Sequence, residues 1–197
     1  MSKVFIKGSG GNISAETTDF LLKERVVTLE GDITDEKGDE IVRQLLILAS
    51  QSPAEITMLI NSPGGSVSAG LSVIDTMRLI GRDITCVCTG LAASMAAVIF
   101  SEGTKRLMFP HSRVMIHQAK VIGNISGNSE TLSQIGKHLS DTSKTVDGIL
   151  AKNTGKTLKE IAKATSFDNY MTPEEAISFG IADATADSLD SFMEVRI

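Results

Sequence analysis

The chain has 197 residues, of which 42% are hydrophobic, and this is enough for one domain with a substantial buried core. Its formal net charge is −5 and no basic stripe is present, which argues against nucleic acid as a partner. No run of about eighteen apolar residues occurs, and the N-terminus has no apolar secretory segment. We therefore expect a cytoplasmic protein that makes no contact with a membrane.

Segments with strand and helix patterns alternate along the chain. Residues 1–18, rich in Gly, Ser and Thr, predict a flexible N-terminal arm or a processed leader. Strands are expected at 25–29, 55–60, 83–89, 105–109 and 113–116. Helices are expected from 35 to the Ser52-Pro53 stop and at 67–80, 130–152, 158–164 and 173–180, with a small-residue helix starting near Ser94 after a turn at Gly90. The alternation predicts an α/β fold with right-handed crossovers, in a single domain over residues 19–197.

The expected helix at 130–152 differs from the others because its apolar positions form one long stripe. A stripe on a helix that projects from a compact core often contacts a partner subunit. The stripe consists of Leu132, Ile135, Leu139, Val146, Ile149 and Leu150.

Ser94 lies among very small residues in the segment Gly90–Ala97. Small neighbours let a substrate backbone approach closely, and a helix start would direct its positive end and the amide of Met95 toward the serine oxygen. The segment is not the Gly-x-Ser-x-Gly elbow of the α/β-hydrolases. Taken alone, a serine among alanines is more often a helix-packing residue than a nucleophile.

A base for Ser94 must be one of three histidines. His138 falls inside the long helix and His111 in a turn, so both are expected at the surface. His117 ends an apolar strand, which would hold its ring rigidly beside other strand ends. Without Ser94, a structural histidine would be the first interpretation of His117.

Two further features bear on chemistry. The turn Asn61–Ser66 contains Gly64 and Gly65, whose exposed amides would suit an oxyanion or an extended substrate, although an ordinary tight turn is the simpler reading.

Cys86 and Cys88 share a strand face and cannot easily bridge each other, and no further ligands at metal spacing accompany them. We interpret them as core thiols in a reducing environment and expect no metal site.

These segments together resemble the proteolytic subunit of the ATP-dependent Clp protease, the ClpP family. The likeness spans residues 20–185. The matching blocks occur in the family's order and are Leu22–Val26, Asn61–Gly65, Gly90–Met95, Ser112–Gln118 and Pro173–Asp183.

The resemblance implies a serine endopeptidase with Ser94 as nucleophile, His117 as general base and Asp168 as the acid that orients the imidazole. The residues alone do not select Asp168 among the carboxylates, and a turn or capping role is the default for it. The resemblance also implies an oxyanion hole made by the amides of Gly65 and Met95.

For the whole molecule the resemblance implies a ClpP/crotonase-like core of repeated β-α units with a projecting helical handle at about 120–152. It implies a homo-oligomer of two stacked heptameric rings, to which an AAA+ ATPase delivers unfolded proteins. ATP would then be used by that partner, and we expect no cofactor in this chain, which lacks a Walker-type motif. The strand at 55–60 lacks the tyrosines with which family members usually form the ATPase docking pocket, so the identity of the ATPase stays open.

The leading prediction is therefore a self-compartmentalised serine endopeptidase. A structural ring subunit is a second candidate, which the presence of Ser94, His117 and Asp168 argues against. A crotonase-type acyl-CoA enzyme is a third, but it would not need a Ser–His pair. A phage-type capsid maturation protease that works without ATP is a fourth, and only data on partners would separate it from the first.

Overall fold

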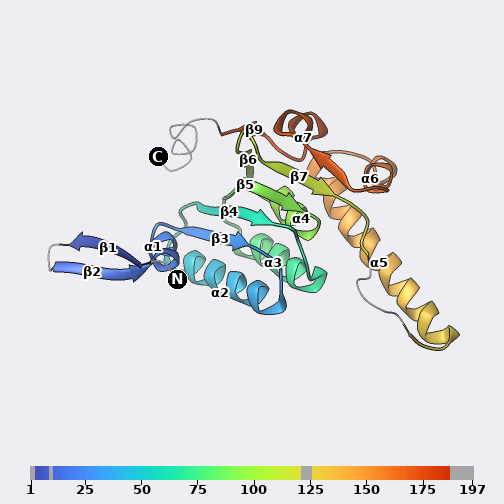
Figure 1. The fold of residues 1–197 in the computed structure, drawn as a ribbon, viewed down its shortest axis with the longest axis horizontal. Helices are drawn as coiled ribbons and strands as arrows, with labels where there is room; N and C mark the ends of the chain where they lie inside the picture. Colours follow the sequence, from blue (N-terminus) through green and yellow to red (C-terminus); the bar gives the residue numbers. More distant parts are fainter. Residues whose placement is uncertain (1–2, 9–10, 121–125, 187–197) are drawn as a thin grey trace.

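Figure 1 shows the computed structural model of the chain, which describes residues 3–8, 11–120 and 126–186. Within these residues, a seven-stranded sheet forms the centre of the molecule. Its strands are β3 (Val26–Glu30), β4 (Ile56–Ser62), β5 (Ile84–Ala93), β6 (Lys105–Met108), β7 (Arg113–Ile116), β8 (Asn169–Met171) and β9 (Ala184–Thr185). The order β3-β4-β5-β6-β9 is parallel throughout, while β7 pairs in parallel with the last part of β5 and antiparallel with β8.

A helix connects β3 to β4, β4 to β5 and β5 to β6, as parallel connections require. The helices of the described residues are α1 (Thr17–Lys23), α2 (Asp35–Gln51), α3 (Val67–Ile80), α4 (Met95–Ser101), α5 (Ser129–Thr154), α6 (Leu158–Ala164) and α7 (Pro173–Phe179). Contacts run from α2 to α3, from α3 to α4 and from α4 to α5, so these helices form a continuous layer against the sheet (Figure 1). Leu29, Met58 and Phe100 are fully buried between the layers. The α/β class predicted from the sequence is confirmed.

Local capping chemistry sets the helix ends. Ser66 accepts a hydrogen bond from the Ala69 N–H at the start of α3, and Gly81 ends that helix with a φ of 56°. Thr172 and Glu175 form a reciprocal capping box at the start of α7, where Pro173 occupies the first turn. These ends lie where the sequence predicted them.

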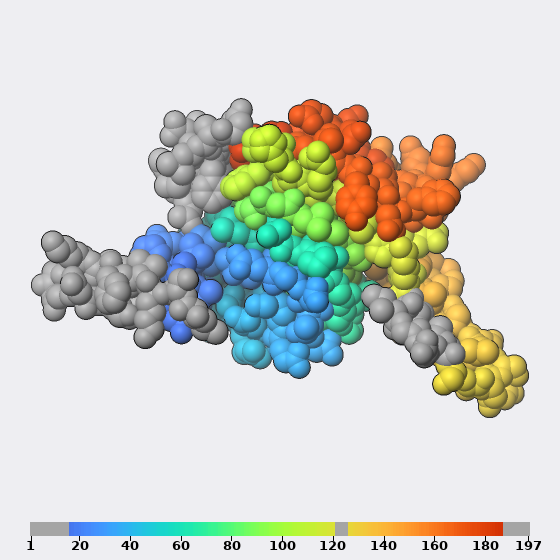
Figure 2. Space-filling model, viewed as in Figure 1, coloured from blue at the N-terminus to red at the C-terminus, as the bar shows by residue number. Residues whose placement is uncertain are grey.

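The predicted long helix is confirmed as α5, and its N-terminal end projects from the body of the molecule (Figures 1 and 2). Val146, Ile149 and Leu150, in its C-terminal half, are buried against the core. Leu132, near the other end, keeps 46% of its surface exposed. The apolar stripe is therefore used for intramolecular packing over only part of its length.

The expected turn at Gly90 is wrong, because β5 continues through Gly90 to Ala93. Leu91, Ala92 and Ala93 find new partners in β7, which keeps the strand extended. Gly90 instead serves close packing, since a Cβ there would lie 2.7 Å from Oδ1 of Asn61. That Oδ1 accepts a hydrogen bond of 3.1 Å from the Leu91 N–H and so joins β4 to β5.

The predicted N-terminal arm contains regular backbone that its composition did not predict. An antiparallel hairpin, β1 (Lys3–Gly8) and β2 (Gly11–Glu16), precedes α1. The strands β8 and β9 were also unexpected, since runs of three and two residues carry too little pattern to be recognised. No helix in the described ranges has both the length and the apolar character needed to cross a membrane.

Candidate active site

Ser94 occupies the junction between β5 and α4 and has an unusual backbone conformation. Its φ is 55° and its ψ is −124°, a region that residues with a Cβ rarely adopt. The Ser94 N–H donates to the Met115 carbonyl of β7 at 2.8 Å, and the Ser94 carbonyl accepts from Ala97 at 3.0 Å. These contacts hold the serine in its strained turn, with α4 buried behind it.

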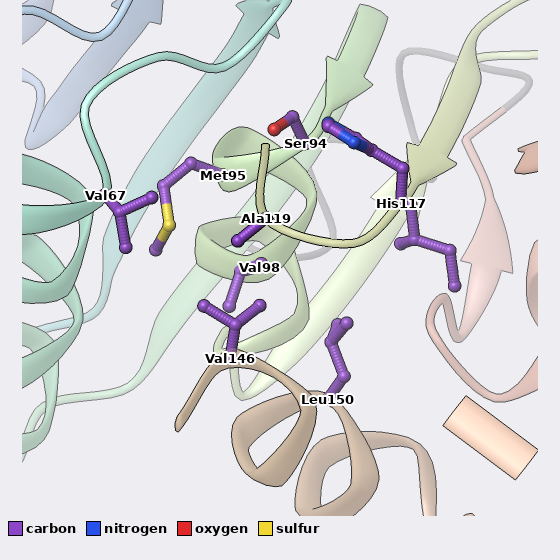
Figure 3. Close-up of a pocket in the computed structure, with 9 residues that line it drawn as sticks. Val67, Ser94, Met95, Val98, His117, Ala119, Val146 and Leu150 are labelled. Carbon is purple, nitrogen blue, oxygen red and sulfur yellow. The ribbon is translucent and has the colours of Figure 1, made fainter. Parts of the chain in front are cut away.

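His117 directly follows β7 and faces Ser94. Because β7 pairs with β5 in the register Ala93 to Met115, the residues that follow these positions lie at one edge of the sheet. Figure 3 shows the imidazole of His117 directed toward Ser94. Burial, followed by the positive charge of Lys120, lowers the pKa of His117, so the neutral imidazole is favoured. A neutral imidazole can accept the proton of a serine hydroxyl.

Asp168 lies close to His117 in the backbone but is paired with another side chain. The antiparallel register of β7 and β8 pairs Ile116 with Asn169, and its continuation places His117 opposite Asp168. However, Oδ1 of Asp168 accepts a hydrogen bond of 2.6 Å from Nζ of Lys120, and this bond lowers the pKa of Asp168. Nδ1 of His117 is buried and has no hydrogen-bond partner among the described residues. The structure thus brings the three predicted side chains together without joining Asp168 to His117.

The glycine turn after β4 packs directly against Ser94. Gly64 has a φ of 97°, and a Cβ there would lie 2.7 Å from Cβ of Ser94 and 3.0 Å from the Met95 nitrogen. The turn is fixed by hydrogen bonds of 2.9 Å from the Ile33 N–H to the Gly64 carbonyl and of 2.7 Å from the Ser66 N–H to the Ile33 carbonyl.

Two amides remain available at this site. The bonds that fix the glycine turn leave the N–H of Gly65 unused among the described residues. Met95 is the first residue of α4, so its N–H has no acceptor within the helix. The two amides predicted for the oxyanion hole therefore lie on backbone segments that meet at Ser94.

An apolar pocket adjoins the serine and the histidine (Figure 3). Sequence analysis did not identify its lining, because the residues come from four separate segments of the chain. Apart from Ser94 and His117, the pocket is lined by Val67, Met95, Val98, Ile116, Ala119, Val146 and Leu150. The α5 helix closes one side of it through Val146 and Leu150.

The other histidines and the two cysteines lie apart from this chemistry. His111 and His138 are exposed, as expected. Cys86 and Cys88 are free thiols buried in β5, and burial raises the pKa of Cys86 to about 12. Over the described ranges, no three His, Cys, Asp or Glu side chains gather in a way that could hold a metal ion.

A serine on a strained strand-to-helix junction, with a histidine and free amides beside it, is the arrangement of a serine hydrolase. The Clp protease family model matches residues 9–188 of the chain. The chain also resembles the ATP-dependent Clp protease proteolytic subunit of Ligilactobacillus salivarius, with 39% identity over 183 residues, which are 91% of this chain and 92% of that protein. The chain therefore belongs to the Clp protease family and is a serine endopeptidase of that family.

Proposed function

We propose that this chain hydrolyses peptide bonds through Ser94, His117 and Asp168, with the amides of Gly65 and Met95 as the oxyanion hole. The observation that carries the proposal is the bond from the Ser94 N–H to the Met115 carbonyl. It fixes the proposed nucleophile to β7, the strand that His117 directly follows. This backbone arrangement supports the roles of Ser94 and His117, which the sequence analysis assigned only by resemblance to a family.

The reaction follows from the proton positions. His117 removes the proton of the Ser94 hydroxyl while the serine oxygen attacks the scissile carbonyl. The negative charge that develops on the substrate oxygen is stabilised by the amides of Gly65 and Met95, which are already oriented by the turn and by α4. His117 then donates the proton to the leaving amine, and water releases the acyl group by the same steps in reverse.

Asp168 would stabilise the imidazolium that forms in this reaction. A carboxylate hydrogen-bonded to Nδ1 also fixes the imidazole tautomer. This role is supported by two observations: Nδ1 of His117 has no hydrogen-bond partner among the described residues, and the continued register of β7 and β8 sets the residue Asp168 opposite the residue His117. The role therefore requires a rearrangement of the Asp168 side chain.

The pocket beside Ser94 supports a preference for an apolar substrate side chain on the acyl side of the cleaved bond. Its lining is almost wholly aliphatic, apart from Met95 and the two catalytic residues.

For the assembly, we propose a homo-oligomer of two stacked heptameric rings in the cytoplasm, with α5 as the contact between rings. In the N-terminal half of the α5 stripe Leu132 is exposed and Ile135 and Leu139 are only half-buried, which supports a protein contact there. We further propose that an AAA+ ATPase of the Clp type delivers unfolded proteins and uses ATP, so that this chain needs no cofactor. The name of the Ligilactobacillus relative supports ATP dependence.

The test is labelling with a fluorophosphonate probe across a size-exclusion profile, with Ser94→Ala as the matched control. We expect label only in the wild type and only in fractions of high molecular mass. Equal labelling of Ser94→Ala would overturn the assignment of the nucleophile. Absence of label from both proteins, in particles of full size, would favour a structural ring subunit or a triad that aligns only with a partner bound.

A further inference from the structure

Asp168 and Lys120 form an ion pair that competes with the triad. Nζ of Lys120 lies 2.6 Å from Oδ1 of Asp168, and the two side chains are 55% and 48% exposed. His117 lies beside both residues, three positions before Lys120 in the sequence and opposite Asp168 in the continued register of β7 and β8. Its buried Nδ1 has no hydrogen-bond partner among the described residues. The carboxylate needed by the imidazole is thus engaged by a neighbouring ammonium group.

The backbone register favours an exchange of partners by Asp168. The pairing of Ile116 with Asn169 already sets His117 opposite Asp168. The loop beyond is tied by a hydrogen bond of 2.9 Å from the Gln118 N–H to the Thr165 carbonyl. A side-chain rotation of Asp168 therefore decides between Lys120 and His117, because opposed residues of an antiparallel pair lie on the same face of the sheet.

We infer that Lys120 is a positioning residue that restrains catalysis by holding Asp168 away from His117. The inference rests on the proposed triad. An exposed ion pair is weak and sensitive to salt, so this restraint is easily released. Lys120 also acts on His117 directly, because its positive charge lowers the pKa of the imidazole. Lys120, in the loop after β7, and Asp168, just before β8, are the two charged groups that shift this pKa.

The test compares Lys120→Met with wild type in the assembled fraction, using the rate of fluorophosphonate labelling. Removing the ammonium group frees Asp168, and we expect the rate at neutral pH to rise about two- to fivefold, the scale of an exposed ion pair. The acid limb of the pH–rate profile should move to higher pH, because losing a cation and gaining a carboxylate both stabilise the imidazolium. A purely structural lysine would leave this limb unmoved.

Three variants make the result decisive. Lys120→Arg should keep the wild-type rate and profile, since the cation remains. Lys37→Met removes another surface lysine paired with a carboxylate, Glu40 at 3.2 Å, and should change neither. In an Asp168→Asn background, Lys120→Met should no longer accelerate labelling at neutral pH, because no carboxylate is left to release. Only the part of the shift of the acid limb that comes from the lost cation should remain.

The outcomes separate this inference from the proposed function. Wild-type labelling that Ser94→Ala abolishes, together with an unchanged or slower Lys120→Met, would refute the restraint and leave the nucleophile assignment intact. Acceleration that persists in the Asp168→Asn background would refute a mechanism through Asp168. If Lys120→Met does not assemble, Lys120→Gln provides the same loss of charge with a side chain suited to water.

Discussion

The strained backbone of Ser94 predicts that removing its Cβ stabilises the protein. At a φ of 55° and a ψ of −124°, Ser94 is one of two non-glycine residues with positive φ in the described ranges, the other being Arg25. Such a conformation costs about 1–3 kcal/mol for a residue with a side chain, whereas glycine adopts it freely. Ser94→Gly removes this strain but also adds about 0.5–1 kcal/mol of chain entropy to the unfolded state.

The net gain is about 1.25 kcal/mol, obtained by subtracting the middle of the entropy range, about 0.75 kcal/mol, from the middle of the strain range, about 2 kcal/mol. For a chain of this size each kcal/mol corresponds to about 2–4 °C, so the melting temperature should rise by about 3–5 °C. The matched control is Ser94→Ala, which loses the hydroxyl but keeps the Cβ and the strain. Both variants should lose fluorophosphonate labelling.

The assay is thermal unfolding followed by circular dichroism, at one protomer concentration and with the assembly state checked by sedimentation. Ser94→Gly should melt above Ser94→Ala, which should melt close to wild type. The reasoning is refuted if Ser94→Gly melts at or below Ser94→Ala. That order would show that the junction is not strained and that the glycine only adds disorder to the unfolded chain.

Four further predictions concern the site and the stability of the fold. Gly64→Ala places a Cβ against Ser94, so we expect a fall in labelling rate of about 100-fold or more, in particles of unchanged size by sedimentation. Burial lowers the pKa of His117, so labelling should persist below the ordinary histidine pKa of about 6.5; a midpoint above 6.5 would contradict this. The unfolded chain binds that proton first, so the His117 contribution to stability should decline as the pH falls through about 6.5, measured by urea unfolding. The side chain of Arg106 is 14% exposed, donates to two backbone carbonyls at 3.0 and 2.9 Å and pairs with Asp183. Arg106→Met leaves these acceptors without a donor, so it should lower the free energy of unfolding by about 3 kcal/mol. A loss below about 0.5 kcal/mol would refute a stabilising role for Arg106.

Much of the fold was predictable because its signals are local. The range 67–80 became α3 because Ser66 caps it and Gly81 ends it, and both devices are visible in the sequence. The range 158–164 became α6 with a capping box between Thr157 and Glu160. Such helices are specified by residues within a few positions of their ends, so sequence reasoning recovers them.

The parts that were missed depend on distant partners. Nothing near Gly90 indicates that β5 continues, since the reason is the pairing of Leu91 to Ala93 with β7. The roles of Asn61 as a tie between strands and of Lys120 as the partner of Asp168 also arise from tertiary contacts. A basic residue three positions after His117 was the only local signal for the latter.

The three predicted catalytic side chains are not held equally firmly, and the sheet explains the difference. Ser94 and His117 follow two parallel strands that are joined inside the sheet, and a backbone hydrogen bond ties one to the other. Asp168 precedes β8, a three-residue strand that pairs with β7 alone in the described ranges, and the neighbouring Phe167 is 83% exposed. A side chain on such a short, exposed edge is stabilised mainly by its partner. Under the proposed triad, control is therefore expected to act through Asp168, while Ser94 and His117 stay in place.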